Sequence, residues 1–499
     1  MFTFEKLTTI NGFDIENPEN AVQNSYAWSM AELGDYIYVG TERNLFSTAA
    51  KAWNENTPSS LASDSDNTAE IWRYKKGSGP CIWQRVFKAK PCDNVIGFRS
   101  MVMHDNGKEC ALYAAGVGKK VSLYKSIDGI HWRKIDTSNI SGTSSRALVS
   151  FKRKLYIATL EEAIGGNIPF LYSSYDPEIK PFKSVIDMRK INFDRSKNPV
   201  GGIDDLKVFN NRLYVGIATD NGAEIWRSND CKPRTNNWTL VADKGFGDKL
   251  NTSIMSSGVF KDHLYVAVSK KIPLALMAPL GFDLIKIDKK DNWELVVGGK
   301  PILPTCPFTG YRNIATSGYK SGFNNFFNVY GWQVSSFKDN LIITTLDFST
   351  NVKTIITSLI YNKNTYIDKW GCKNYYNLLT CYGKIYSIIQ KYNYPIGFDM
   401  YASKDGCHFK PINLNGLNNS NNYGGRTLYV SSENDLYLGT ANPFDGLEVW
   451  QVNYKDSCNC EDINITNYLN KMEQINKELI KIYPKLLKLL PKTFTLLVQ

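Results

Sequence analysis

The feature that most restricts the fold is a repeat of four short strands, seen most clearly in residues 202–251. Residues 206–209 and 212–216 alternate apolar and polar side chains on either side of an Asn-Asn pair, as a tight hairpin requires. Residues 223–227 and 238–241 supply the third and fourth strands. Four antiparallel strands per repeat, rich in Tyr, Trp, Val and Ile, are typical of a propeller blade rather than of a helical repeat.

Copies of the second strand indicate an all-β, seven-bladed β-propeller. They begin near Tyr38, Tyr113, Tyr156, Tyr214, Tyr265, Ile342 and Tyr437. Their spacing runs from about 40 to over 90 residues, whereas a compact blade needs about 40 to 45, so several blades carry insertions. A ring of eight blades is the alternative, if residues 377–392 form one more hairpin.

The start of the chain predicts how the ring closes. Residues 4–14, FEKLTTINGFD, resemble residues 238–248, WTLVADKGFGD, which form a fourth strand and its exit loop. The last repeat ends after its third strand, at Trp450. We therefore expect residues 4–10 to pair with residues 447–452 and to complete the last blade, which removes the exposed sheet edges of an open ring.

The repeat pattern divides the chain into three predicted regions: the propeller over 1–454, an insertion in blade six over 347–397, and a tail over 455–499. The insertion contains KTIITSLIYN and NLLTCYGKIYSIIQKY, which could form short helices or an extra hairpin. The tail is predicted to be an amphipathic helix, because apolar residues recur at alternating steps of four and three. These residues are Tyr468, Met472, Ile475, Leu479, Ile482, Leu486 and Leu489.

The tail helix has three possible roles. It could pack back on the ring, mediate self-association, or dock on an anionic membrane surface with its lysines. Pro484 is expected to kink this helix or to end its first half.

Composition narrows the class of protein. The net charge of +11 permits binding to a polyanion, but no nucleic-acid module is recognisable and the lysines could simply be dispersed. The first residues show no basic segment followed by an apolar run, and no stretch reaches the ~20 apolar residues that span a bilayer. We therefore expect a soluble, cytoplasmic protein. Its ten cysteines are scattered and none forms a C-x-x-C pair, so we expect reduced thiols, with a few disulfides as the alternative.

The large insertions all fall between the second and third strands of their blades. In a propeller these connections emerge on one face, which we call the loop-rich face. Because function usually lies on loops held by a rigid scaffold, this face is the candidate working surface.

One residue per blade occupies the same register at the start of the innermost strand, at the mouth of the central channel. These residues are Trp28, Arg99, Arg146, Asp204, Met255, Trp332 and Arg426. The arginines could bind a carboxylate, sulfate or phosphate, and the tryptophans could stack on a sugar or another ring. The alternative is structural, with arginines paired between blades and tryptophans filling the wedges. Further candidate carboxylates are Asp205, Glu161 and Glu162.

Two turns have the pattern Ser-x-Asp-Gly-x-x-aromatic: SIDGIHW at 126–132 and SKDGCHF at 403–409. They resemble the Asp-box hairpin of sialidases and related propellers, which marks the fold and not catalysis. The wider pattern of LYVGT-like and EIWRS-like strands with GFGD-like exit loops resembles a group of poorly characterised bacterial propeller proteins. That resemblance implies the architecture and no particular activity. Sialidases are six-bladed, and their Tyr nucleophile, its Glu partner and the acid/base Asp cannot be placed here.

The leading hypothesis is a non-catalytic binding scaffold that takes a small anionic or sugar ligand at the funnel, or a protein partner on the loop-rich face. The alternative is a glycosidase-like hydrolase or lyase acting on an acidic sugar, with Asp204 or Asp205 as acid/base. The sequence predicts no cofactor and no metal site, since the four histidines fall in turns away from the loop-rich face and form no H-E-x-x-H motif.

Overall fold

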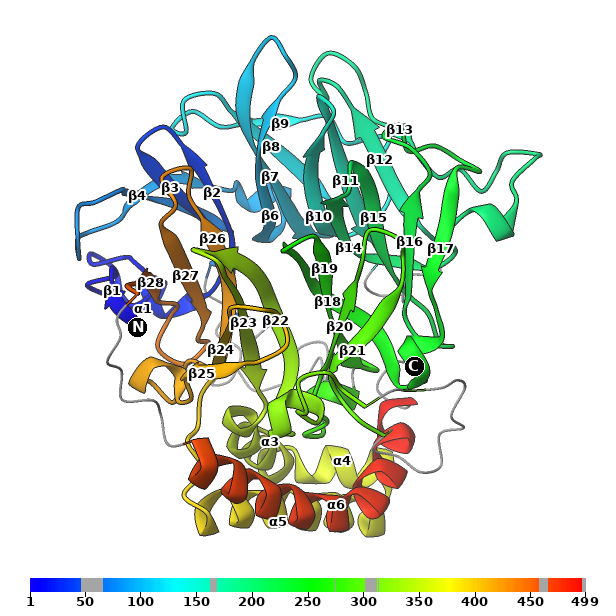
Figure 1. Ribbon diagram of the computed structural model, residues 1–499. Coiled ribbons are helices and arrows are strands. Elements are labelled where there is room, and N and C mark those ends of the chain that lie inside the picture. The colour runs from blue at the N-terminus through cyan, green and yellow to red at the C-terminus, as the bar shows by residue number, and fades with distance from the viewer. Residues whose placement is uncertain are drawn as a thin grey trace.

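The computed structural model describes residues 1–45, 66–161, 168–272, 274–300, 312, 314–456 and 465–495. It is mostly β, with several four-stranded antiparallel sheets arranged around a common centre and a layer of helices at one end (Figure 1).

The strands pair in groups of four that are consecutive in sequence, except in the last group, and we call each group a sheet. Single pairings join some neighbouring groups: Tyr26 with Ala441, Glu42 with Gly97 and Leu346 with Gly424. The first two sheets are β2 (Asn24–Leu33), β3 (Tyr36–Arg43), β4 (Glu70–Lys75) and β5 (Gln84–Lys88), then β6 (Val95–Asp105), β7 (Cys110–Gly118), β8 (Ser122–Ser126) and β9 (Arg133–Ile135). The next two are β10 (Ser144–Phe151), β11 (Lys154–Leu160), β12 (Phe170–Ser174) and β13 (Lys183–Ser184), then β14 (Gly202–Phe209), β15 (Arg212–Ala218), β16 (Glu224–Ser228) and β17 (Trp238–Ala242). They are followed by β18 (Asn251–Phe260), β19 (His263–Lys270), β20 (Asp283–Ile287) and β21 (Trp293–Val297), then β22 (Asn328–Phe337), β23 (Asn340–Asp347), β24 (Met400–Ser403) and β25 (Lys410–Asn413). The last sheet combines β26 (Gly424–Val430), β27 (Leu436–Ala441) and β28 (Val449–Tyr454) with β1 (Phe2–Lys6).

The two ends of the strand order meet in that last sheet. β1 runs antiparallel to β28, with Phe2 opposite Tyr454 and Lys6 opposite Trp450. The amide of Leu7 continues this pairing by donating to the carbonyl of Val449. The innermost strands contact one another in the order β2, β6, β10, β14, β18, β22 and β26, and β26 contacts β2. The prediction that the N-terminal strand completes the last sheet is confirmed.

A repeated corner explains the GFGD-like loops. In each corner a glycine and the apolar residue after it both have positive φ, and the apolar side chain is buried: Gly12-Phe13, Gly245-Phe246, Gly322-Phe323 and Gly416-Leu417. An asparagine then donates its side-chain amide to that glycine's carbonyl and to a carboxylate at the start of the third strand. The pairs are Asn24 with Glu70, Asn251 with Asp283, Asn328 with Asp399 and Asn422 with Glu448.

The Asp-box-like turns serve as structural turns. The Asp128 carboxylate accepts from the backbone amides of Ile130 and His131 at 2.9 and 2.8 Å. Gly129 has a φ of +75°, and a Cβ there would lie 1.9 Å from the hydroxyl of Tyr38. The pattern therefore requires glycine for both conformation and space.

The connection between β23 and β24 is helical. It contains α3 (Ser349–Tyr361), α4 (Lys363–Trp370) and α5 (Cys372–Lys391). The extra hairpin of the eight-bladed alternative is therefore wrong, since residues 377–391 lie in α5. The period of the buried residues explains this result, because Tyr375, Leu378, Tyr382, Ile385 and Ile389 follow helical steps of three and four.

The C-terminal helix α6 (Ile465–Thr495) packs against this layer. Its apolar stripe is buried from Met472 to Leu489, and the Tyr483 hydroxyl donates to the carbonyl of Pro279. The helix continues through Pro484, so the predicted end at this proline is wrong, while the alternative, a kink, stays a prediction. Packing along the stripe compensates for the lost backbone hydrogen bond. Self-association through the same stripe stays a prediction and would require the helix to leave this site.

The shorter helices serve as corners and connections. They are α1 (Pro18–Gln23) and the 3-10 turns η1 (Pro91–Asp93), η2 (Arg195–Lys197), η3 (Lys244–Gly247), η4 (Leu274–Leu276), η5 (Ser321–Asn324) and η6 (Gly416–Asn418).

Candidate functional site

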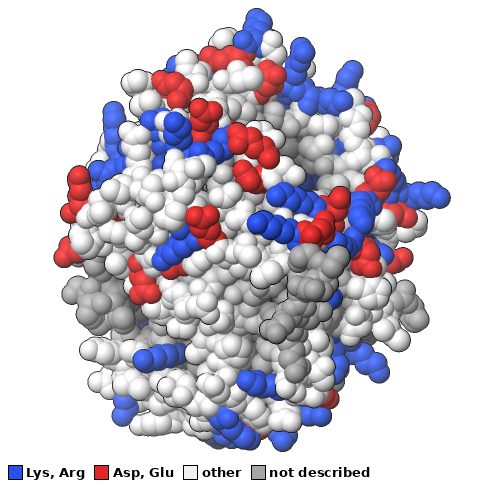
Figure 2. All heavy atoms as spheres, turned by 60° about the vertical axis from the view of Figure 1, so that its left-hand side comes forward, with Lys and Arg blue, Asp and Glu red and all other residues white. Residues whose placement is uncertain are grey.

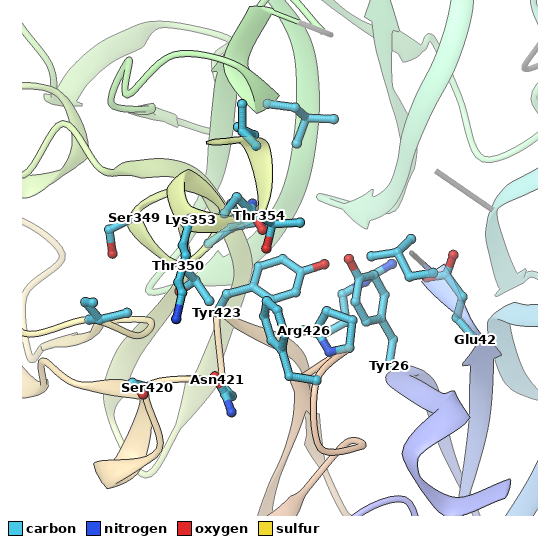
Figure 3. Close-up of a pocket in the computed structure, with 18 of the residues that line it drawn as sticks. Tyr26, Glu42, Ser349, Thr350, Lys353, Thr354, Ser420, Asn421, Tyr423 and Arg426 are labelled. Carbon is cyan, nitrogen blue, oxygen red and sulfur yellow. The ribbon is translucent and has the colours of Figure 1, made fainter. Parts of the chain in front are cut away.

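A cavity of about 1800 Å³ lies between the innermost strands and the helical layer. Its wall combines residues of β2, β6, β10, β22 and β26 with residues of α1, α3 and α5. Figure 3 shows Thr350, Lys353 and Thr354 on α3 on one side and Glu42 on the other, with Arg426 between them in this view. The cavity therefore lies on the face that carries the helical insertion.

The seven residues predicted to share one register do share one backbone feature. Each is skipped in the pairing between the innermost strand and its neighbour, as the extra residue of a β-bulge. The skipped residues are Trp28, Arg99, Arg146, Asp204, Met255, Trp332 and Arg426. A bulge redirects the side chain of its extra residue. All of them except Asp204 line the cavity.

Two of the arginines lie over tryptophans of a neighbouring sheet. The guanidinium carbon of Arg99 lies 5.3 Å from the ring centroid of Trp28, and that of Arg426 lies 5.1 Å from the ring of Trp332. Both distances suit a cation–π contact. Arg99 also donates to the hydroxyl of Ser144 at 3.1 Å. The bulges thus bring cations and aromatic faces together at the channel mouth.

A group of tyrosines extends the aromatic wall. The ring of Tyr26 lies 5.6 Å from that of Trp332 and 5.8 Å from that of Tyr423, both edge-on, and Tyr330 lies 5.9 Å from Trp332. Sequence reasoning missed these tyrosines. For Tyr26 and Tyr330 a usable signal was present, because each stands two residues before a tryptophan of the shared register.

The described part of the cavity wall holds more basic than acidic residues. It contains four basic residues, Arg99, Arg146, Lys353 and Arg426, and two acidic residues, Glu19 and Glu42. Arg426 is only 8% exposed. Burial, with a further contribution from Arg99, lowers the pKa of Arg426 to about 9, although Glu42 acts in the opposite direction. The described residues offer Arg426 no ion pair and give its Nε no hydrogen-bond partner.

Glu42, at the end of β3, was also missed by sequence reasoning. It is buried and lines the cavity. It also lines a second cavity of about 880 Å³, together with Trp28 and Arg99. These three residues therefore stand between two adjoining hollows.

The other predicted carboxylates lie elsewhere. Asp204 accepts from the amide of Ile254 at 3.3 Å, and Asp205 is hydrogen-bonded to the hydroxyl of Ser257, so both link β14 to β18. Burial raises the pKa of Asp205. Neither residue is part of the cavity lining that the structure describes. Glu161 follows β11 outside that lining, and Glu162 lies outside the described residues.

No protein-family model matches the chain, and no curated protein matches it. Among solved structures it is similar to an ancestral GH74 enzyme, with 10% identity and a TM-score of 0.46 over 88% of this chain and 49% of that one. It is also similar to the extracellular domain of BT3049, described as a hybrid two component system of B. thetaiotaomicron, with 10% identity and a TM-score of 0.43 over 86% and 40%. A third similarity is to the tricorn protease, with 10% identity and a TM-score of 0.38 over 100% and 41%.

These structural neighbours are β-propeller proteins, and the chain spans less than half of the length of each of the three. Within the parts of the chain that the structure describes, no helix is long and apolar enough to cross a membrane. The same residues contain no group of three or more His, Cys, Asp or Glu side chains that could hold a metal ion.

Proposed function

We propose that the chain is a seven-bladed β-propeller that binds a small anionic ligand in the cavity beneath its helical layer, without catalysing a reaction. The seven second strands, the seven bulges and the contact of β26 with β2 support this number of blades. The observation that carries the function is Arg426, a buried arginine in the cavity wall with no ion pair among the described residues.

The lining favours a ligand that combines an acidic group with a ring. A carboxylate, sulfate or phosphate would accept paired hydrogen bonds from a guanidinium. The faces and edges of Trp332 and Tyr423 would contact a sugar or aromatic ring. Thr350 and Thr354 on α3 would hydrogen-bond to ligand hydroxyls. An acidic sugar meets all three requirements.

A hydrolase or lyase acting on an acidic sugar is the second candidate. The observation that favours it is Glu42, a buried carboxylate in the cavity wall that could serve as an acid or base. Asp204 and Asp205, the acids proposed from sequence, do not share that wall in the described lining.

The binding proposal is tested by isothermal titration with glucuronate, sulfate and neutral glucose. We expect heat from the two anions and none from glucose. Arg426→Met should weaken anion binding at least tenfold, because one charged bidentate partner is worth about 1.5–3 kcal/mol. Arg195→Met, which removes an exposed arginine of η2, should change nothing. Equal binding by the Arg426 variant, or no heat from any anion, would refute the proposal.

Turnover separates the two candidates. On fluorogenic uronides, the binding proposal predicts no product. Product formation that Glu42→Gln abolishes and Asp204→Asn preserves would instead establish the enzyme.

A further inference from the structure

The positive charge of the chain is concentrated in the helices. Residues 349–391 and 465–495, which hold α3 to α6, contain twelve lysines against three acidic residues, a net charge of +9 out of the chain's +11. All other residues together therefore carry only +2. Figure 2 agrees with this count, since the end of the molecule that holds the helices shows blue spheres with little red, whereas the sheets show both colours.

Most of the lysines whose side chains the structure describes on these helices are exposed, with few carboxylate partners. The described ion pairs within the layer are Lys391 with Glu478 at 2.6 Å and Lys477 with Glu473 at 3.0 Å. Further exposed lysines have no ion pair with the described residues: Lys363, Lys369, Lys373, Lys384, Lys481, Lys485 and Lys488. Their charge is therefore available to an external surface.

Apolar side chains are exposed on the same helices. Ile360 and Tyr361 at the end of α3 are 59% and 67% exposed, and Tyr376 of α5 and Ile480 of α6 are each about half exposed. The ammonium of Lys363 lies 5.6 Å from the ring centroid of Tyr376. We call these exposed apolar residues and the exposed lysines of α3 to α6 together the outer face of the layer.

We propose that this outer face docks on an anionic membrane surface. Lysines near such a surface are attracted by the negative lipid headgroups, while tyrosine and isoleucine side chains enter the interfacial region. The helices would lie on the bilayer and not span it. The proposal is independent of ligand binding in the cavity.

The residue types favour lipid over nucleic acid. The two helical segments contain no arginine, the residue that most often reads bases and phosphates with paired hydrogen bonds. The exposed isoleucines cannot stack on bases but can enter a lipid interface. Lysines spread over several helices match a lipid surface, on which many negative headgroups are mobile and none has a fixed position.

Cosedimentation of the full chain with vesicles tests the proposal. We expect binding to vesicles of phosphatidylcholine with 30% phosphatidylserine, none to pure phosphatidylcholine, and release in 500 mM NaCl. Joint replacement of Lys481, Lys485 and Lys488 by glutamine should weaken binding steeply, by about fivefold per lysine. Ile480→Ser should weaken it at unchanged charge.

A matched variant controls for net charge. Replacing the exposed lysines Lys108, Lys232 and Lys290 of the sheets by glutamine removes the same charge from a different surface and should leave binding intact. Equal loss in both triple variants, or no binding to phosphatidylserine vesicles, would overturn the proposal. Tighter binding to an RNA or DNA oligonucleotide than to the vesicles would overturn it as well.

Discussion

Buried basic residues occur in two settings in this molecule. In the sheet of β18 to β21, the ammonium of Lys270 lies 2.8 Å from Asp248 and 3.0 Å from Asp283, and Arg312 lies 2.5 Å from Asp283. At the channel mouth, Arg426 lies over a tryptophan and faces the cavity, and the described residues give it no ion pair.

The pKa values differ in the same way. Burial alone would raise the pKa of Asp283, but Arg312 and Lys270 outweigh it and hold that pKa well below its usual range. The pKa of Arg426 is instead lowered to about 9, because burial is not offset by a paired carboxylate. A buried cation that is paired with a carboxylate of the protein stabilises the fold. A buried cation without such a pair can instead bind an anion from outside the protein.

The largest expected effect comes from breaking the neutralised cluster. Asp283→Ala should lower the free energy of unfolding by about 3–5 kcal/mol, since it leaves two buried cations with one carboxylate fewer. Urea denaturation measures this loss. Asp220→Ala, which breaks the exposed pair with Lys271, is the control and should cost less than about 1 kcal/mol. Similar losses in the two variants would contradict the comparison.

Two buried carboxylates, like Arg426, have no ion pair with the described residues, but they carry the opposite charge. Asp347 accepts from the amides of Ser349 and Gly397, Asp399 accepts from Asn328 and from the Tyr468 hydroxyl of α6, and neither has a cation within ion-pair distance among the described residues. Burial raises the pKa of Asp347 to about 8 and that of Asp399 to about 6.

A pH dependence follows from these raised values. The folded state holds both protons more tightly than the unfolded state, so the stabilisation is complete below about pH 4 and is lost as the pH rises through 6 and 8. We expect a loss of about 3 kcal/mol between pH 6 and pH 8 from this pair. Thermal unfolding at several pH values should show a flatter profile for Asp347→Asn than for the wild type. An unchanged slope in the variant would show that other groups cause it.

Replacing the unpaired Arg426 should change the free energy of unfolding in the opposite direction to replacing a paired cation. Arg426→Met should leave the free energy of unfolding unchanged or raise it by about 1 kcal/mol, because an apolar side chain replaces a buried charge. Arg312→Met, its counterpart in the neutralised cluster, should lower it by about 3 kcal/mol. Urea denaturation with and without sulfate measures both, and sulfate should stabilise the wild type but not the Arg426 variant. Destabilisation by Arg426→Met as large as by Arg312→Met would assign Arg426 to the fold.

The smallest expected effect concerns the contact between α6 and the sheets. Tyr468→Phe removes a hydroxyl that lies 3.0 Å from Asp399 and should cost about 1–2 kcal/mol. Faster hydrogen exchange of the α6 amides would report this loss. Tyr454→Phe, which removes an exposed bond to Asp456, should leave exchange in α6 unchanged.

The sheets could be predicted because their determinants are local. The structure confirms three patterns, each of which is contained in a short stretch of sequence. They are the alternation within residues 206–216, the Gly-Phe corners, and the strand-and-loop pattern that residues 4–14 share with residues 238–248. The shared register of the bulge residues could also be predicted, because each lies at a similar number of residues before the turn that ends the innermost strand.

The cavity wall could be predicted only in part. Trp28, Arg99 and Arg426 came from the register, but Glu42 and Lys353 enter the wall through contacts between segments far apart in sequence. From the sequence, residues 377–391 could form a helix or a hairpin. Their helical period became decisive only once the positions buried against α3 and α6 were known. The continuation of α6 through Pro484 depends on tertiary packing in the same way.

The most direct test of the central claim is to locate an anion in the cavity by anomalous diffraction from crystals soaked in selenate. We expect an anomalous peak within hydrogen-bonding distance of the Arg426 guanidinium in the wild type, and no peak there in Arg426→Met. A cavity without anomalous density, while selenate binds at exposed lysines elsewhere in the same crystal, would contradict it.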